Sequence, residues 1–137
     1  MSRTFTVEGD ITAADTRTAL TTQGSVTAPS SVVPAAMKKI DKIFVAATSE
    51  GLADGAQSVI IRLGGNAVLG GEQVIAVSAL GRIAVQSGSD AAPQLMTAWV
   101  LQDADIEVRP SDTISISAEG PGTDTGTVHI GVTLVYA

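Results

Sequence analysis

The chain has 137 residues, a net charge of −6 and no cysteine. Its length predicts one domain spanning residues 1–137. The absence of cysteine excludes disulfide bonds, thiolate metal sites and a cysteine nucleophile. The lysines, Lys38, Lys39 and Lys42, all fall in one short segment, which is not the extended basic surface that direct nucleic-acid binding requires.

Residues 1–5 lack the charged and then apolar order of a signal peptide, and no stretch approaches the roughly 18 apolar residues of a membrane-spanning helix. We therefore expect the chain to be made as a soluble cytoplasmic protein. Charged residues are only 16% of the sequence, whereas a surface that stays in water normally carries more charge. This composition predicts a protein that covers part of its surface with copies of itself. A sandwich solvated by Thr and Ser is the alternative.

Short runs of alternating apolar and polar residues follow one another along the chain, separated by Gly and Pro turn signals. This spacing is typical of an all-β sandwich or barrel, in which alternate side chains of each strand point into the core. The predicted strands, in chain order, are residues 3–9, 43–47, 57–63, 73–80, 83–86, 95–101, 105–108, 112–118 and 127–136. Residues 73–80 and 83–86 could instead form one long strand bent at Gly81. Eight to ten strands in one domain favour an antiparallel β-sandwich with jelly-roll or related Greek-key topology. Residues 12–38 are weakly patterned and are expected to form an arm or a long loop.

Two of these strands, residues 43–47 and 95–101, are apolar on both faces. A strand of a two-sheet sandwich has one core face and one outer face, so an apolar outer face needs a cover. The cover is either a long loop or arm of the same chain or another subunit, and both interpretations stay open. If it is another subunit, the predicted interface residues are Ile43, Val45, Met96, Ala98 and Val100.

Residues suited to catalysis are few. His129 is the only histidine and lies within a predicted strand, and no Gly-x-Ser-x-Gly nucleophile motif accompanies it. A strand-surface or interface position is therefore the favoured interpretation of His129. We expect no enzymatic activity, no catalytic residue and no cofactor.

Three carboxylates, Asp103, Asp105 and Glu107, alternate along the chain and would share one face of a strand. Such a row could bind a hard cation such as Ca²⁺, which prefers several oxygen ligands. A solvated edge whose charges deter strand pairing is the simpler interpretation, and it is the one favoured here. The three residues are thus weak candidates for a metal site, and none is predicted.

Three segments together resemble viral structural proteins of the jelly-roll kind: residues 42–46, the turn and strand at 110–116, and the closing strand at 126–134. The resemblance concerns strand patterning over most of the chain. It implies a capsid, minor capsid or decoration subunit in a virion, with copies of itself and other structural subunits as partners. The first 37 residues contain only Arg3 and Arg17 as basic residues, which departs from the basic arm of many small coat proteins. A glycan-binding or receptor-binding module of the same fold is the alternative.

Overall fold

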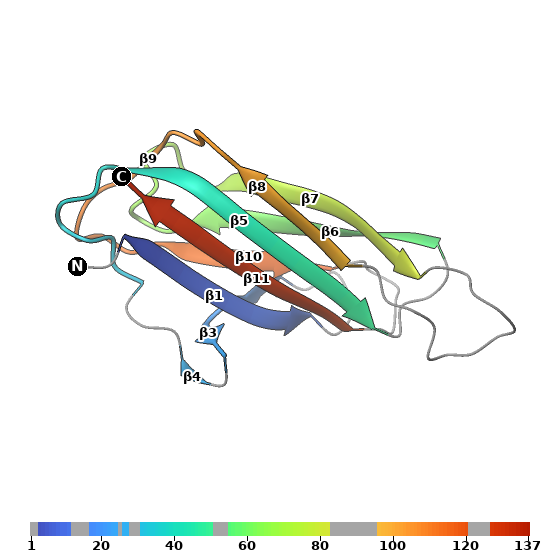
Figure 1. The fold of residues 1–137 in the computed structure, drawn as a ribbon. Coiled ribbons are helices and arrows are strands. Elements are labelled where there is room, and N and C mark those ends of the chain that lie inside the picture. The colour runs from blue at the N-terminus through green and yellow to red at the C-terminus, as the bar shows by residue number, and fades with distance from the viewer. Residues whose placement is uncertain are drawn as a thin grey trace, which may run out of the picture.

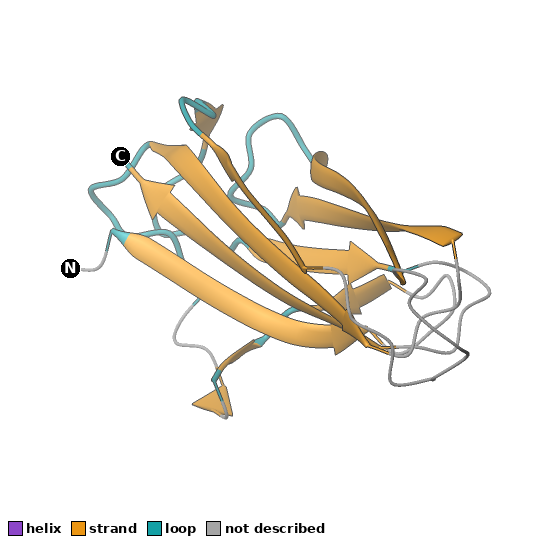
Figure 2. Cartoon of the chain, turned by 45° about the vertical axis from the view of Figure 1, so that its right-hand side comes forward, coloured by secondary structure: helices purple, strands orange, loops and turns teal. Residues whose placement is uncertain are grey.

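A computed structural model describes residues 3–11, 17–24, 26–27, 31–50, 55–82, 96–120 and 127–137. The regular elements in these ranges are all strands, and no helix there is long and apolar enough to cross a membrane. The strands form two antiparallel sheets that face each other (Figures 1 and 2). The first sheet contains β1 (Thr4–Ile11), β3 (Thr22–Gln23), β4 (Val26–Thr27), β5 (Lys39–Glu50), β8 (Met96–Leu101), β9 (Ile106–Glu107) and β11 (Thr127–Tyr136). The second contains β2 (Arg17–Ala19), β6 (Gly55–Gly64), β7 (Gln73–Arg82) and β10 (Ser115–Glu119).

The strand order identifies the topology. Apart from the short β3, β4 and β9, the sheets have the orders β1-β11-β5-β8 and β2-β10-β6-β7. Along the chain, the first of these eight strands pairs with the last, the second with the seventh, the third with the sixth, and the fourth with the fifth. A long hairpin rolled into two four-stranded sheets gives this set of pairs, which defines a jelly roll. The prediction of an all-β sandwich with jelly-roll topology is confirmed.

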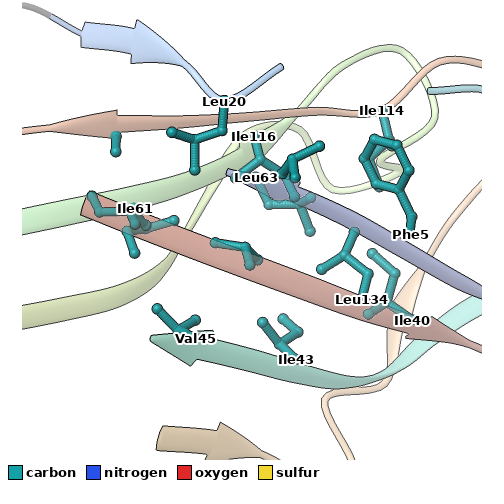
Figure 3. Packing of buried hydrophobic residues seen from close by; sticks show 14 of the residues in the cluster. Phe5, Leu20, Ile40, Ile43, Val45, Ile61, Leu63, Ile114, Ile116 and Leu134 are labelled. Atoms are coloured by element: carbon teal, nitrogen blue, oxygen red, sulfur yellow. The ribbon is translucent and has the colours of Figure 1, made fainter. Parts of the chain in front are cut away.

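The core lies between the two sheets and follows the period-two pattern of the strands (Figure 3). On β11 and β10 the residues predicted to face inward are all buried, and the same holds for β1 and β6. The buried hydrophobic residues on these four strands are Phe5, Val7, Ile11, Val59, Ile61, Leu63, Ile116, Ala118, Val128, Ile130, Val132, Leu134 and Tyr136. Burial of this apolar surface is the main favourable term in the folding of the sandwich.

Parts of the weakly patterned segment 12–38 join the sheets. β2 pairs with β10 at the margin of the second sheet, and Glu8 of β1 pairs with Thr22 of β3. Val32 forms an isolated bridge with Thr113. The described portions of this segment are therefore tied to the sandwich by backbone pairing. The strand predicted at residues 83–86 lies outside the described residues, as does Leu95.

The end of β11 carries a buried phenol. Tyr136 is 2% exposed, and desolvation raises the pKa of its hydroxyl from 10.0 to about 12. The folded protein therefore holds this proton at pH values where the unfolded chain has released it. Since the unfolded state binds fewer protons between about pH 10 and pH 12, the free energy of unfolding must fall there, by up to ~1.4 kcal/mol per pH unit from this one group.

Replacing Tyr136 with phenylalanine is expected to remove this contribution while leaving the ring in place. Urea unfolding at several alkaline pH values gives the free energy of unfolding of both proteins. The lysines titrate in both, so their contribution drops out of the difference between the two free energies. Because the chain has a single tyrosine, the ultraviolet absorbance of tyrosinate reports the titration of Tyr136 directly. Equal loss of stability in both proteins, or tyrosinate formation near pH 10 in the folded protein, would contradict the assignment.

Candidate functional site: the outer face of the first sheet

The outer face of the first sheet is built from rows of side chains that cross its strands. Backbone register places Thr6 opposite Thr133, Thr133 opposite Phe44, and Phe44 opposite Val100. Residues directly opposite each other in antiparallel strands point to the same side. One row therefore runs from β1 over β11 and β5 to the edge strand β8.

The next row along the strands contains smaller residues. Glu8 is opposite Gly131, and Gly131 is opposite Ala46. A Cβ atom built on Gly131 would meet no atom within 4 Å, so the face is hollow at that position. A groove of about 360 Å³ opens here, lined by Thr6, Phe44, Val45, Ala46, Val100, Gly131 and Thr133.

This groove is almost free of charge. Phe44 is 40% exposed and Val100 is 47% exposed, although both are large and apolar. The hydroxyl oxygens of Thr6 and Thr133 lie 2.9 Å apart and hydrogen-bond to each other. We call the surface made by Thr6, Phe44, Ala46, Val100, Gly131 and Thr133 the apolar face.

Charged residues of the same sheet border the apolar face. Glu8 lies on β1 in the same row as Gly131. Beyond the Gly131 row, Asp10 is opposite His129, and His129 Nδ1 is 2.7 Å from Asp10 Oδ1. A second groove, of about 690 Å³, lies beside this pair and is also lined by Glu8, Thr22, Thr48 and Ala46. Beyond the Phe44 row, Lys42 is opposite Val135.

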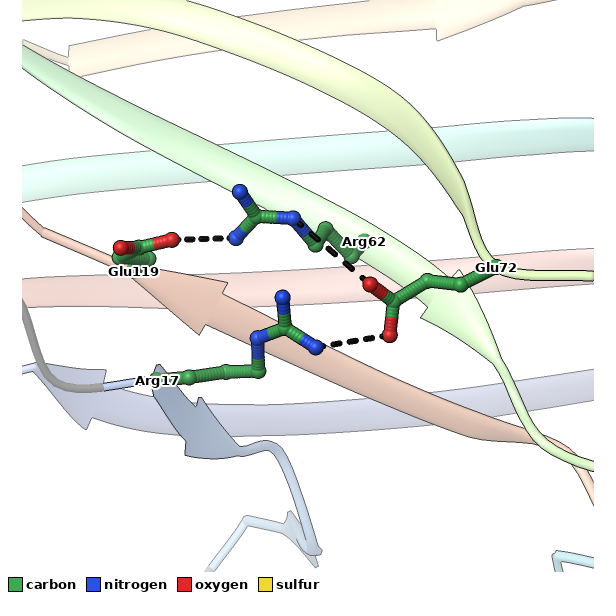
Figure 4. A network of polar contacts seen from close by, with 4 residues as sticks. All are labelled: Arg17, Arg62, Glu72 and Glu119. Carbon is green, nitrogen blue, oxygen red and sulfur yellow. Dashed lines mark hydrogen bonds and ion pairs between the residues drawn. The ribbon is translucent and has the colours of Figure 1, made fainter.

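The outer face of the second sheet has a different character. Arg17 Nη1 lies 2.8 Å from Glu72 Oε2, and Arg62 bridges Glu72 and Glu119 (Figure 4). Each of these side chains is partly exposed. Exposed ion pairs add little to stability, but they keep a sheet face in contact with water. The two outer faces of the sandwich thus differ: one is charged, and the other has an apolar centre.

The structure corrects part of the predicted interface. Ile43 and Val45 are 1% and 3% exposed and belong to the core between the sheets (Figure 3), so their prediction as interface residues is wrong. Their neighbours on β5, Phe44 and Ala46, point outward instead.

Val100 lies on the outer face as predicted, and its role in an interface stays a prediction. Ala98 and Met96 pair with Ala46 and Thr48 through the backbone, while their side chains lie outside the described part of the chain. Four residues of the apolar face were not predicted: Phe44, Gly131, Thr6 and Thr133. The signal for Gly131 was available, because glycine inside a strand often marks a close approach by another group.

The three weak metal candidates, Asp103, Asp105 and Glu107, do not share one face of a strand. Asp103 and Asp105 have positive φ values of 53° and 51°, so they belong to a tight loop and do not alternate along a strand. Asp105 lies 3.4 Å from the Lys39 ammonium, and only Glu107 of the three is in a strand. Within the described residues, no group of three His, Asp or Glu side chains could hold a metal ion.

No protein-family model matches the sequence, and it matches no curated protein sequence. Among solved structures, the PRD1 vertex protein P5 is 10% identical with a TM-score of 0.43, and 96% of each chain is covered. The structure of the infectious bursal disease virus Gt strain is 12% identical with a TM-score of 0.37, and the VP2 subviral particle of that virus is 10% identical with a TM-score of 0.35. The present chain spans 37% and 33% of those two chains. The jelly-roll assignment rests on the strand order of the two sheets.

Proposed function

We propose that this chain is a structural subunit of a virion, as a capsid, minor capsid or decoration protein, and that it assembles with copies of itself. The observation that carries the proposal is the apolar face on the first sheet. Contiguous apolar surface on a soluble domain marks a site of contact with another molecule. The apolar face is the surface that assembly would bury.

The contrast between the two outer faces supports this orientation. Arg62 and its two glutamate partners suit a surface that stays in water. Phe44 on β5 and Val100 on the edge strand β8 suit a subunit contact, since aromatic residues are enriched and charges depleted at the centre of interfaces. We therefore place the second sheet toward solvent and the first toward a neighbouring subunit.

Composition and fold are in line with a structural role. Jelly rolls serve in viral capsids, lectins and cupins, so the fold alone does not select among these functions. The low content of charged residues, 16%, favours a chain that buries much of its surface in an assembly. A non-enzymatic role is proposed because the only histidine pairs with Asp10 on an open sheet face, where their side chains are 42% and 57% exposed. The few basic residues point to contacts with protein subunits and not with nucleic acid.

Replacing Val100 with lysine is expected to dissociate the assembly into folded monomers. The new ammonium group would have to lose its water in an apolar contact, which costs several kcal/mol for an unpaired charge. Val74→Lys is the matched control, because Val74 is 54% exposed on the second sheet and its replacement should leave the assembly intact. Sedimentation velocity measures the effect, and circular dichroism checks the fold. A Val100→Lys protein that sediments like the unmodified assembly would contradict the proposed contact.

The virion role predicts closed assemblies of one defined size. Negative-stain electron microscopy of the concentrated protein should show uniform rings, vertices or shells, or uniform decoration when a particle of the parent virus is supplied. Heterogeneous aggregates or isolated monomers in this experiment would count against a structural subunit.

A glycan-binding module is the second candidate, and the groove beside Asp10 and His129 favours it. Glu8, Asp10 and Thr48 there offer oxygen atoms that can hydrogen-bond sugar hydroxyls, over a floor that includes Ala46 and Gly131. Saturable binding of a soluble oligosaccharide by the Val100→Lys monomer, measured by calorimetry and lost in Asp10→Ala, would favour this function. Assembly without such binding favours the structural role.

A further inference from the structure

We infer that the hollow at Gly131 receives the Phe44 ring of a second copy, in a two-fold contact with the two first sheets packed antiparallel. This inference rests on the proposed function and specifies the partner and the geometry of the apolar face. It starts from the fact that the face carries both a protruding side chain and a hollow of its own. The experiments below separate failure of this geometry from failure of assembly as such.

The protrusion and the hollow lie in adjacent rows. Phe44 is 40% exposed in one row, and the next row contains Ala46 and Gly131, which are opposite each other. The open space around the position of a Gly131 Cβ atom is lined by small groups and by Phe44 itself. Each copy can therefore offer a ring and accept one.

A two-fold axis places the ring of each copy in the hollow of the other. In a self-complementary dimer, residue i of one copy contacts residue j of the other, and j contacts i. The proposed axis lies in the plane of the interface, perpendicular to the strands and between these two rows. Rotation about it exchanges the Phe44 row with the Gly131 row. The backbone of each Phe44 then lies over Ala46 of the other copy, and its ring enters the Gly131 hollow on the adjacent strand. Two sheets packed in this way are aligned to within about 30°.

The charges at the ends of the face select the antiparallel direction. Lys42 lies beyond the Phe44 row, whereas Asp10 and His129 lie beyond the Gly131 row. The same axis brings the Lys42 end of each copy onto the Asp10 end of the other. In a parallel arrangement, the acidic end of one subunit, with Glu8 and Asp10, would face the same acidic end of the other subunit. Opposite charges at the rim steer association, and like charges oppose it.

The first test fills the hollow. Gly131→Gln adds a side chain where no atom lies within 4 Å and where φ is outside the left-handed region, so the monomer should fold normally. Its dimer dissociation constant, measured by sedimentation equilibrium, should rise at least tenfold, which corresponds to about 1.4 kcal/mol. Ala36→Gln is the control, since Ala36 is exposed in the turn before β5 and its replacement should leave the dissociation constant unchanged.

The second test uses the absence of cysteine from the chain. Phe44→Cys and Ala46→Cys proteins, mixed and oxidised, should form a mixed disulfide dimer, because the proposed axis places these two positions of β5 opposite each other. Phe44→Cys alone should cross-link poorly, because the axis separates the two Phe44 positions. Strong cross-linking of Phe44→Cys to itself would overturn the proposed position of the axis.

The outcomes separate the two proposals. Weakening by Gly131→Gln together with the mixed disulfide supports the geometry. A protein that assembles, yet is unaffected by Gly131→Gln and gives no mixed disulfide, overturns the geometry and leaves the structural role standing. An unmodified protein that stays monomeric overturns both.

Discussion

Replacing Leu134 with alanine is expected to lower the free energy of unfolding by about 2–5 kcal/mol. Leu134 has no exposed surface and lies on the central strand β11, between Phe5 of β1 and Ile43 of β5 (Figure 3). The truncation removes apolar contacts and leaves a cavity that strands held on both sides cannot close. Urea unfolding, followed by the fluorescence of the single tryptophan, measures the loss.

Leu69→Ala is the matched control for this change. Leu69 is 45% exposed, so the same atoms are removed without a cavity, and the expected loss is within about 0.5 kcal/mol. Both proteins are best compared in the Val100→Lys background, because dissociation of an assembly would otherwise add to the unfolding free energy. Similar losses for the two replacements would contradict the placement of Leu134 at the centre of the core.

Replacing Gly65 with alanine is expected to be as damaging as a core truncation. Gly65 has a φ of +97°, and an added Cβ would lie 2.6 Å from the Thr113 carbonyl oxygen and 2.9 Å from the Ile114 Cα. These are backbone atoms of the chain leading into β10, and the same carbonyl accepts the Ala67 N–H at 2.8 Å. Backbone strain of about 1–3 kcal/mol and overpacking of about 1–3 kcal/mol should both reduce stability.

The control for Gly65 separates these two contributions. Gly71 also has a positive φ, +80°, but nothing lies within 4 Å of an added Cβ, so Gly71→Ala should show the backbone cost alone. Thermal unfolding by circular dichroism ranks the variants. If Gly71→Ala is as destabilising as Gly65→Ala, the close approach of the turn to Thr113 is not the cause.

The core could be predicted from the sequence wherever a strand has one apolar and one polar face. In β10 and β11 the alternation of Ile116, Ala118, Val128 and Leu134 with polar residues leaves one possible inward face, because a strand has a period of two. Local pattern therefore suffices for these strands. Their partners were not predictable in the same way, since β1 and β11 lie at opposite ends of the chain and their register depends on the closed sandwich.

The sequence does not show which side chains of residues 43–47 point outward, and there is a physical reason for this. Residues 43–47 are apolar at every position, so alternation does not say whether Ile43 and Val45 or Phe44 and Ala46 face the core. The packing of the second sheet decides it, and a single strand carries no information about that packing. The prediction named residues on β5 and β8, and on β5 it chose the face that packs in the core.

The prediction that Asp103, Asp105 and Glu107 share one face of a strand was wrong for a different reason. A period of two was assumed for residues 103–107, but Asp103 and Asp105 have left-handed backbone conformations, and the Ala104 N–H donates to the Asp41 carbonyl at 2.8 Å. Asp tolerates positive φ better than most residues. An alternating string of Asp is therefore as compatible with a loop as with a strand edge.

The molar mass of the unmodified chain in solution, measured by size-exclusion chromatography with light scattering over a dilution series, tests the central claim most directly. If the apolar face is a subunit contact, the mass should be a defined multiple of 13.8 kDa and should persist on dilution. A mass of 13.8 kDa at every concentration would contradict the claim that Phe44 and Val100 are covered by a second copy.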